Sequence, residues 1–220
     1  MNYLAIDTST MISTVTIAND IEILGDFNVN QSKTHSESLV PMIETLLSLL
    51  GMTIKDIDKF IIAQGPGSFT GLRIGMTVAK TLAQIEKKDL ITISTLKAMA
   101  AGSTSKRAKL PLIDARSTRV YGALYDENLE EIIPENLYEI DDLAKMANEK
   151  GLEIEMIGLL NDKYFDKFEN AVRSPININN CIGKSLIRLC QEENTIAKEL
   201  YQISPNYLRK SQAEREFEKK

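Results

Sequence analysis

The residues best suited to do chemistry lie in a glycine-rich stretch at positions 65–75, which reads GPGSFTGLRIG. An apolar run precedes this stretch, and a helical pattern over about residues 70–86 follows it. Glycines let main-chain N–H groups approach a ligand closely, and the N-terminus of a helix attracts negative charge. The stretch is therefore an anion-binding candidate, and its loop residues are Gly65, Gly67, Ser68 and Gly71.

The spacing of this loop departs from both common phosphate-binding motifs. A P-loop has the pattern G-x-x-x-x-G-K-[ST], but Gly67 and Gly71 enclose three residues, and Arg73 rather than lysine follows. The dinucleotide motif G-x-G-x-x-G fails because Thr70 stands where its third glycine should be. A second interpretation therefore stays open, in which the glycines only permit a tight turn and close helix packing.

The histidine and cysteine content excludes several kinds of site. His35 is the one histidine of the chain, so a zinc or iron site built on paired histidines is excluded, and we predict no metal site. A Ser-His-Asp triad would need His35 as its base, but a lone histidine in a polar stretch is more often a surface or capping residue. Cys181 and Cys190 fall in one helical pattern, roughly 13 Å apart and too far for a disulfide.

The composition is that of a soluble globular protein, with 43% hydrophobic and 26% charged residues among 220. A formal charge of −5 gives no general attraction to nucleic acid or to an anionic membrane. The first residues, MNYLAIDTST, lack the pattern of a signal peptide, and no apolar run approaches the ~20 residues of a membrane span. We therefore expect a cytoplasmic protein that does not bind a membrane.

Two predicted helices are apolar over more of their circumference than a surface helix needs. The first ends near Leu50. Its N-cap is either Thr34, in a capping box with Glu37, or Ser38. We favour Ser38, because this start places Pro41 in the first turn, where a proline is tolerated.

The second wide helix follows the glycine loop and carries two apolar rows. We expect its large residues to face the core, and small residues recur every four positions beside them. The large residues are Ile74, Val78, Leu82 and Ile85, and the small ones are Gly71, Gly75, Ala79 and Ala83. Apolar and small positions together cover roughly 200° of this helix, against about 100° for a surface helix. The helix is therefore either deep within its own domain or covered on one flank by a second protein.

The order of predicted elements occurs twice along the chain. Strand, hairpin, helix, strand and helix repeat, which predicts an α/β fold of duplicated βββαβα units with mixed sheets. The polar, basic segment 102–109 marks the boundary. The expected domains are 1–101, which holds the glycine loop and both wide helices, and 102–220, a degenerate second unit. The last helix is a candidate to pack back on the first domain, and residues 211–220 are expected to be frayed.

This duplicated plan resembles the two-domain actin-like ATPase (ASKHA) superfamily, whose domains face each other across a nucleotide cleft. There the first hairpin of each domain presents an aspartate, followed by glycine, to the phosphates and the metal. The matching turns here are DTST and DARS, and both lack the glycine. The resemblance implies a vestigial cleft that has lost catalysis and requires no cofactor, while weak ATP, ADP or Mg²⁺ binding stays open. Its candidate residues are Asp7, Ser9, Thr10, Asp114 and Arg116.

Several short motifs extend the resemblance to one family. They are IDTST at 6–10, HSE at 35–37, the glycine loop at 65–75, STL at 94–96, IDAR at 113–116 and PNYLR at 205–209. In order and spacing they resemble bacterial TsaB (YeaZ-like) proteins over nearly the whole chain. That family supplies the dimerisation subunit of the tRNA threonylcarbamoyladenosine machinery and carries no catalytic centre.

The resemblance implies a non-catalytic subunit that binds and activates TsaD. TsaD transfers the threonylcarbamoyl group to the adenosine next to the anticodon of ANN-decoding tRNAs, and it binds its metal through paired histidines. The implied partners are TsaD in a heterodimer, TsaE in a ternary complex, tRNA only through the complex, and a second copy where TsaD is absent. In the family the two wide helices form a bundle with the partner. The expected partner-binding flank is Leu39, Ile43, Leu46, Leu50, Gly75, Met76, Ala79 and Ala83.

Two other functions stay open. One is a weak Mg²⁺-dependent nucleotide-binding or hydrolysing protein that uses Asp7 and Asp114, or a peptidase-like protein, although metal ligands for the latter are missing. The other is a homodimer with no role in the pathway, which only the motifs disfavour. The sequence leaves open the resting oligomeric state, the TsaE contact surface and the basic residues that approach tRNA. The candidates for tRNA contact are Lys106, Arg107, Lys109, Arg116 and Arg119.

Overall fold

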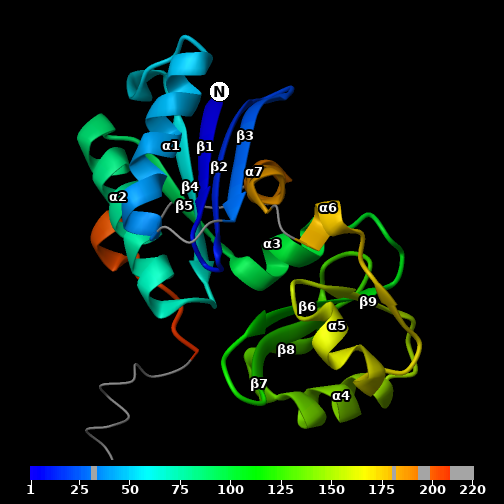
Figure 1. Ribbon diagram of the computed structural model, residues 1–220. Coiled ribbons are helices and arrows are strands. Elements are labelled where there is room, and N and C mark those ends of the chain that lie inside the picture. The colour runs from blue at the N-terminus through cyan, green and yellow to red at the C-terminus, as the bar shows by residue number, and fades with distance from the viewer. Residues whose placement is uncertain (31–33, 180–181, 193–198, 209–220) are drawn as a thin grey trace, which may run out of the picture.

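The computed structural model describes residues 1–30, 34–179, 182–192 and 199–208. Two five-stranded mixed sheets follow one another along the chain, and helices pack against both (Figure 1). Cys181 and residues 211–220 lie outside the described residues, so the predictions for them stay predictions. Cys190 is a buried free thiol.

The first sheet has the strand order β3-β2-β1-β4-β5. β1, β2 and β3 are antiparallel neighbours, whereas β4 and β5 run parallel to β1. The strands span Asn2–Asp7 (β1), Ile12–Asn19 (β2), Ile23–Asn30 (β3), Lys59–Gly65 (β4) and Asp89–Ser94 (β5). Because β1, β4 and β5 are parallel, Asp7, the glycine loop and Ser94 lie at the same edge of the sheet.

The second sheet repeats this plan, with β6 in the place of β1. Its order is β10-β9-β6-β7-β8, in which β6, β7 and β8 are antiparallel neighbours and β9 and β10 continue in parallel. The strands span Ala108–Asp114 (β6), Arg119–Tyr125 (β7), Glu131–Glu139 (β8), Ile154–Ile157 (β9) and Ala171–Arg173 (β10). The predicted duplication with mixed sheets is therefore confirmed.

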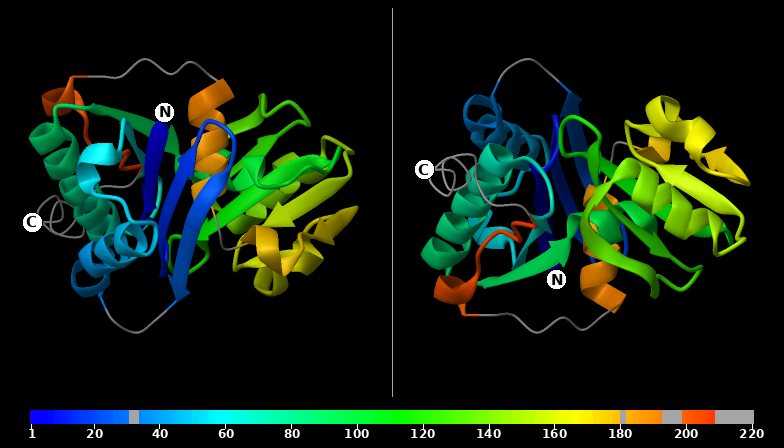
Figure 2. Two further views of the ribbon diagram at one scale, coloured as in Figure 1. Left: turned by 90° about the horizontal axis from the view of Figure 1, so that it is seen from above. Right: turned by 90° about the horizontal axis from the view of Figure 1, so that it is seen from below.

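Helices cover both faces of the first sheet, as the unbroken apolar pattern of its strands requires. α1 and α2 lie on one face, and α7, from the C-terminal half of the chain, lies on the other (Figure 1, Figure 2). The helices span His35–Leu49 (α1), Phe69–Glu86 (α2), Thr95–Ala101 (α3), Ile140–Asn148 (α4), Asn161–Tyr164 (α5), Ile176–Asn179 (α6) and Gly183–Glu192 (α7). Short 3₁₀ turns span Ile54–Asp56 (η1), Phe165–Lys167 (η2) and Leu200–Gln202 (η3).

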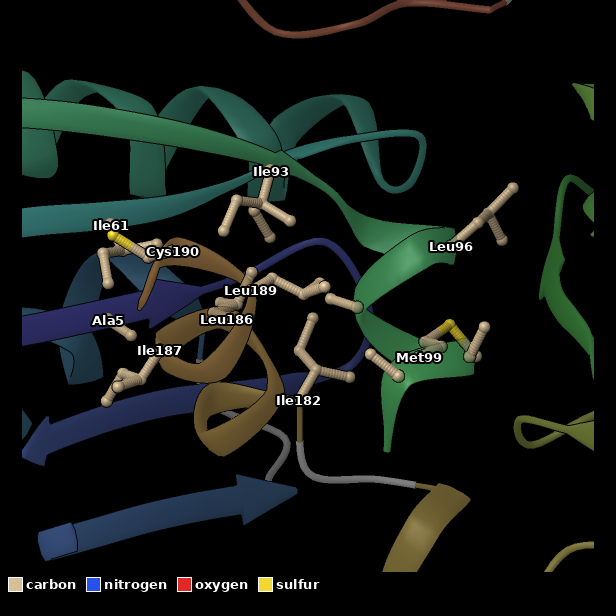
Figure 3. Packing of buried hydrophobic residues seen from close by; sticks show 14 of the residues in the cluster. Ala5, Ile61, Ile93, Leu96, Met99, Ile182, Leu186, Ile187, Leu189 and Cys190 are labelled. Atoms are coloured by element: carbon tan, nitrogen blue, oxygen red, sulfur yellow. The ribbon is translucent and has the colours of Figure 1, made fainter. Parts of the chain in front are cut away.

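The cores of the two sheets meet through α3 and α7. Leu4 and Ile6 of β1 pack with α1 and α2, whereas the alternate residue Ala5 packs with α7. Figure 3 shows the middle of this second cluster, where Leu186 of α7 and Met99 of α3 both take part. The same cluster continues into β6, β7 and β9, so both halves of the chain share one apolar core.

α1 begins earlier than we predicted. Its N-cap is Thr34, so Pro41 lies inside the helix, and the favoured start at Ser38 is wrong. The side chain of Thr34 makes no capping bond to the backbone, and the predicted capping box with Glu37 does not form. Pro41 and Glu37 are both exposed, so water can bind the carbonyl group that the missing proline N–H leaves unpaired.

In the part of the chain that the structure describes, no helix is long and apolar enough to cross a membrane.

Candidate functional site

The glycine loop lies against the turn between β1 and β2. Ser68 N–H donates to the Ser9 carbonyl (2.7 Å), and Thr8 Oγ1 donates to the Gly71 carbonyl (2.7 Å). Ser68 also caps α2, because its Oγ accepts a hydrogen bond from Gly71 N–H (3.2 Å). The two motifs that carry the predicted site residues of the first half are thus in direct contact.

Three glycines at this contact leave no room for a side chain. A Cβ added at Gly67 would lie 2.4 Å from the Ser9 carbonyl oxygen. At Gly71 it would lie 2.0 Å from the Thr8 carbonyl oxygen, and at Gly75 it would lie 2.3 Å from Thr8 Oγ1. The loop is therefore filled by the chain's own turn, and close packing accounts for these glycines. Anion binding by the loop stays a prediction, and the Ser68 and Gly71 N–H groups already donate within the chain.

Asp7 is buried at the end of β1, with 3% of its surface exposed. Burial raises the pKa of its carboxyl group, and hydrogen bonds with Ser9 and the nearby His35 partly oppose this shift. Asp7 Oδ1 accepts the Ser9 N–H (2.8 Å), and Ser9 itself is fully buried. The carboxyl group therefore orders the turn from inside the protein.

Asp114 occupies the matching position at the end of β6, but it is exposed. Its Oδ1 accepts the Arg116 N–H (3.0 Å), which repeats the bond between Asp7 and Ser9. Arg116 has a left-handed backbone conformation (φ +71°) and an exposed side chain. The structure thus places Asp7, Ser9 and Thr10 in one turn and Asp114 and Arg116 in the equivalent turn of the second sheet.

His35 connects three elements, a role that sequence reasoning missed. Its Nε2 donates to the Thr10 carbonyl (2.9 Å), and its Nδ1 lies 2.7 Å from Ser13 Oγ. The ring also lies close to α2, since a Cβ at Gly71 would be 3.3 Å from His35 Cδ2. The histidine therefore joins the start of α1 to the β1–β2 turn and to α2. The position of His35 in the HSE motif was the one feature of the sequence that could have indicated this role.

The predicted partner-binding flank lies inside the chain's own core. Seven of its eight residues are buried, and the eighth, Leu50, is half-buried. The buried members are Leu39, Ile43, Leu46, Gly75, Met76, Ala79 and Ala83. Small residues let α2 lie close to the sheet, since a Cβ added at Gly75 would lie only 3.2 Å from Ile62 Cδ1. The prediction is therefore wrong about which side of α2 is free.

The large apolar residues of α2 lie on the more exposed side, although we expected them to face the core. Ile74, Val78 and Leu82 are half-buried, and Ile85 is 67% exposed. On α1, Leu49 is 72% exposed. Val40 is 45% exposed, but nine positions separate it from Leu49, which places it on the opposite side of the helix. We call the remaining set the α1–α2 apolar surface, and its members are Leu49, Ile74, Val78, Leu82 and Ile85.

A segment near the C-terminus lies along α2 (orange-red in Figure 1). Arg73 Nε donates to Tyr207 OH (2.9 Å), and the Tyr207 and Phe69 ring centroids are 4.6 Å apart. The Arg73 guanidinium also lies 3.9 Å from the Phe69 ring centroid. Asn206 N–H donates to the Gln64 carbonyl (2.8 Å) at the end of β4. The PNYLR motif therefore packs beside the glycine loop, a contact that sequence reasoning did not find.

The basic residues of the boundary segment do not form one patch. Lys109 is buried inside the protein, and Arg107 pairs with Glu153 (3.2 Å), whereas Lys106 is exposed. Lys109 therefore drops out of the candidates for tRNA contact, because its side chain is buried.

Comparison with known proteins places these observations in a family. Over residues 22–216 the chain matches the family described as "TsaD: tRNA N6-adenosine threonylcarbamoyltransferase". The chain belongs to this family. It is 29% identical, over 97% of its length and 96% of the relative's, to the "tRNA threonylcarbamoyladenosine biosynthesis protein TsaB" of Bacillus subtilis. It is 38% identical to the Escherichia coli protein of the same name, over 58% of this chain and 57% of that one. The predicted TsaB (YeaZ-like) character is thus confirmed.

Solved structures agree on the fold. A Pseudomonas aeruginosa protein described as similar to peptidase YEAZ superposes with a TM-score of 0.80 at 23% identity, covering 94% of this chain and 99% of that one. YeaZ from Pseudomonas aeruginosa superposes with a TM-score of 0.75 at 21% identity and the same coverage. A Bacteroides thetaiotaomicron protein with an actin-like ATPase fold gives a TM-score of 0.50 at 14% identity, over 85% of this chain and 95% of that one. The two-domain actin-like α/β architecture is therefore confirmed.

Proposed function

We propose that the chain is a non-catalytic subunit that binds a TsaD-type transferase and activates it. The transferase adds the threonylcarbamoyl group to the adenosine next to the anticodon of ANN-decoding tRNAs. The family match and the TsaB-named relatives support a role in tRNA threonylcarbamoyladenosine biosynthesis. The observation that carries the docking role is the α1–α2 apolar surface.

The two most exposed members of this surface lie at one end of the helix pair. Leu49 is the last residue of α1, and Ile85 lies in the last turn of α2. β4 and β5, which follow these helices, begin side by side at Lys59 and Asp89. Burying large apolar side chains against a partner is favourable by about 25 cal/mol per Å², before the costs of association. A partner helix packed here would cover both side chains.

The environment of the cleft residues supports a non-catalytic role. Asp7 is buried and hydrogen-bonded within its own turn, and backbone atoms of that turn fill the space beside Gly67 and Gly71. His35, the single histidine of the sequence, has both ring nitrogens in contact with the chain itself. These residues therefore fit an ordered packing contact better than a bound nucleotide phosphate.

The proposal extends to the remaining partners. The chain forms a heterodimer with TsaD, joins TsaE in a ternary complex and meets tRNA only through that complex. Where TsaD is absent, two copies pair through the same helices. It works in the cytoplasm and needs no cofactor of its own.

Size-exclusion chromatography with light scattering tests the docking surface. The chain is mixed with the TsaD of its own organism, and we expect a 1:1 complex. Leu49→Glu and Ile85→Glu should each prevent this complex, because each places a charge within the covered surface. Ile21→Glu is the matched control, since Ile21 is 93% exposed at the β2–β3 turn. If both folded variants bind TsaD as the unchanged chain does, the interface lies elsewhere.

A second readout separates activation from nucleotide chemistry. Cells that depend on this chain are assayed for threonylcarbamoyladenosine in tRNA by mass spectrometry. Leu49→Glu and Ile85→Glu should lower the modification, whereas the double variant Asp7→Asn, Asp114→Asn should keep it. Loss of modification in a stable double variant would instead favour the nucleotide-binding function.

A further inference from the structure

A polar cavity of about 290 Å³ lies away from the α1–α2 apolar surface. Its walls come from the loop after α3, from β6, from the β7–β8 turn and from α7. α7 packs on the first sheet, whereas β6 belongs to the second, so the cavity lies where the two halves of the chain meet. Two cationic side chains line it, Lys109 of β6 and Arg188 of α7.

Lys109 is 2% exposed, and its ammonium group is poorly satisfied. Nζ has the carbonyls of Asp126 and Glu127 as acceptors, each at 3.4 Å. Ordinary hydrogen bonds of this kind measure about 2.7–3.2 Å, and an ammonium group has three protons to donate. Burial lowers the pKa of Lys109, and the nearby Glu155 opposes this shift. A buried cation with two long contacts favours an additional acceptor.

Arg188 offers a second donor to the same cavity. Its Nε is buried and has no hydrogen-bond partner among the described residues. Glu192 Oε2 lies 3.6 Å away, which is within ion-pair distance but too long for a hydrogen bond. A buried N–H group without an acceptor costs free energy, so a ligand that accepts from it is favoured.

Acidic groups also lie near the cavity, and the charges of Glu155, Asp126 and Glu127 all act on Lys109. Glu155 is 4% exposed, and its Oε2 accepts a hydrogen bond from Ser103 Oγ (2.6 Å), so it offsets one of the two cations. Glu127 and Glu192 also line the cavity, but both are exposed to solvent. Ser103, Thr104 and Ser105 add hydroxyl groups to the wall.

We propose that this cavity binds a small oxyanion, a phosphate or carboxylate group, between Lys109 and Arg188. The anion accepts hydrogen bonds from the Arg188 guanidinium, whose Nε has no acceptor among the described residues, and from Nζ of Lys109, whose two contacts are long. Because these residues come from different halves of the chain, the anion also holds the halves together. The site is independent of TsaD docking, so either proposal can fail without the other.

Titration of the full chain with sodium phosphate tests this site. Isothermal titration calorimetry and amide NMR shifts are recorded at constant ionic strength, and sodium citrate forms a parallel arm. We expect saturable 1:1 binding with the largest shifts at residues 103–105 and 128. A stronger response to phosphate identifies a phosphate ligand, and a stronger response to citrate identifies a carboxylate.

Matched variants assign the binding to the cavity. Arg188→Gln and Lys109→Met should each weaken binding by at least about tenfold, because each removes a charge-assisted hydrogen bond. Lys106→Gln, an exposed cation outside the cavity, should bind as the unchanged chain does. Non-saturable shifts, or unchanged binding by folded Arg188→Gln, would overturn the proposal. Should Lys109→Met fail to fold, Arg188→Gln and the location of the NMR shifts still decide it.

Discussion

Gly71 sets the distance between α2 and the β1–β2 turn. A Cβ at this position would lie 2.0 Å from the Thr8 carbonyl oxygen. A backbone oxygen cannot rotate away as the end of a side chain can, so helix and turn would have to separate. The same separation would disturb the hydrogen bond from Thr8 Oγ1 to the Gly71 carbonyl.

Gly71→Ala is therefore expected to lower the free energy of unfolding by about 1–3 kcal/mol or more. Urea denaturation measures the change. Gly51→Ala is the control, because its Cβ meets open space and only its left-handed backbone (φ +66°) is strained, at about 1 kcal/mol. Equal losses in the two variants would contradict the close-packing role of Gly71.

Asp7 predicts a distinctive dependence of stability on pH. Because burial raises its pKa, the folded protein holds the proton at pH values where the unfolded chain has lost it. This contribution to stability is therefore largest at low pH and is lost as the pH rises above the unfolded value of about 3.9. Asp7→Asn should raise the free energy of unfolding at pH 7, and its advantage should shrink as the pH falls. Urea denaturation across this range, with both proteins compared at each pH, measures the difference.

Asp58 is the control, because its pKa shift and its effect on the pH dependence of stability are opposite to those of Asp7. A hydrogen bond from Asn2 N–H and the nearby Lys88 lower the pKa of Asp58. This carboxylate stabilises the folded protein above its unfolded pKa, and that contribution is lost as the pH falls through the lowered value. Asp58→Asn should therefore be less stable than the unchanged chain at pH 7 and should approach it in acid. Matching pH profiles for the two variants would contradict both assignments.

At the scale of elements, α2 is positioned by contacts on different sides. Its small residues face the sheet, and Phe69 and Arg73 contact Tyr207 of the C-terminal segment. Lys80 Nζ also donates to the Ile203 carbonyl (2.9 Å) of the same segment. The more exposed side of α2 is therefore the one that carries Ile74, Val78, Leu82 and Ile85.

Tyr207→Ala is expected to loosen the C-terminal segment from α2. The variant removes the hydrogen bond from Arg73 and the stacking with Phe69. Amide hydrogen exchange should therefore become faster at Asn206, whose N–H donates to Gln64. Tyr201→Ala is the control, since Tyr201 is 78% exposed. Equal exchange in both variants would mean that backbone bonds alone hold the segment.

At the scale of the whole molecule, one apolar core connects the two sheets. α7 packs on the first sheet although it follows the second along the chain, and α3 joins the same cluster. A polar link adds to this core, because Ser94 Oγ and Tyr125 OH both donate to the Glu135 carboxylate. The division into domains 1–101 and 102–220 stays a prediction about the chain, and the shared core predicts that they unfold together.

Leu186→Ala is expected to lower the free energy of unfolding by about 2–5 kcal/mol while unfolding remains a single transition. Leu186 is fully buried between the sheets, so its loss affects both. Circular dichroism and tyrosine fluorescence should give coincident urea curves. Lys184→Ala, an exposed position on the same helix, should change stability far less. Two separate transitions in the unchanged chain would show that the halves unfold independently.

Local patterns in the sequence were sufficient for the elements and the architecture. Alternating apolar residues, glycine-rich turns and the repeated order of strands and helices predict most of both sheets, because these features depend on neighbours along the chain. The three-residue strand β10 was not predicted. The motifs also identified the family. The capping pattern and Pro41 did not predict the first residue of α1 correctly, because an exposed proline is tolerated inside this helix.

Contacts between distant residues decided the rest. The wheel of α2 has two apolar rows, and only packing against the sheet determines that Ala79 faces inward while Ile85 is exposed. The burial of Asp7 and the meeting of Lys109 with Arg188 at one cavity likewise depend on residues far apart in the chain. The sequence alone determined what this chain is built from and which family it resembles. Tertiary structure decided which side chains reach solvent, because exposure depends on what the folded chain places next to each residue.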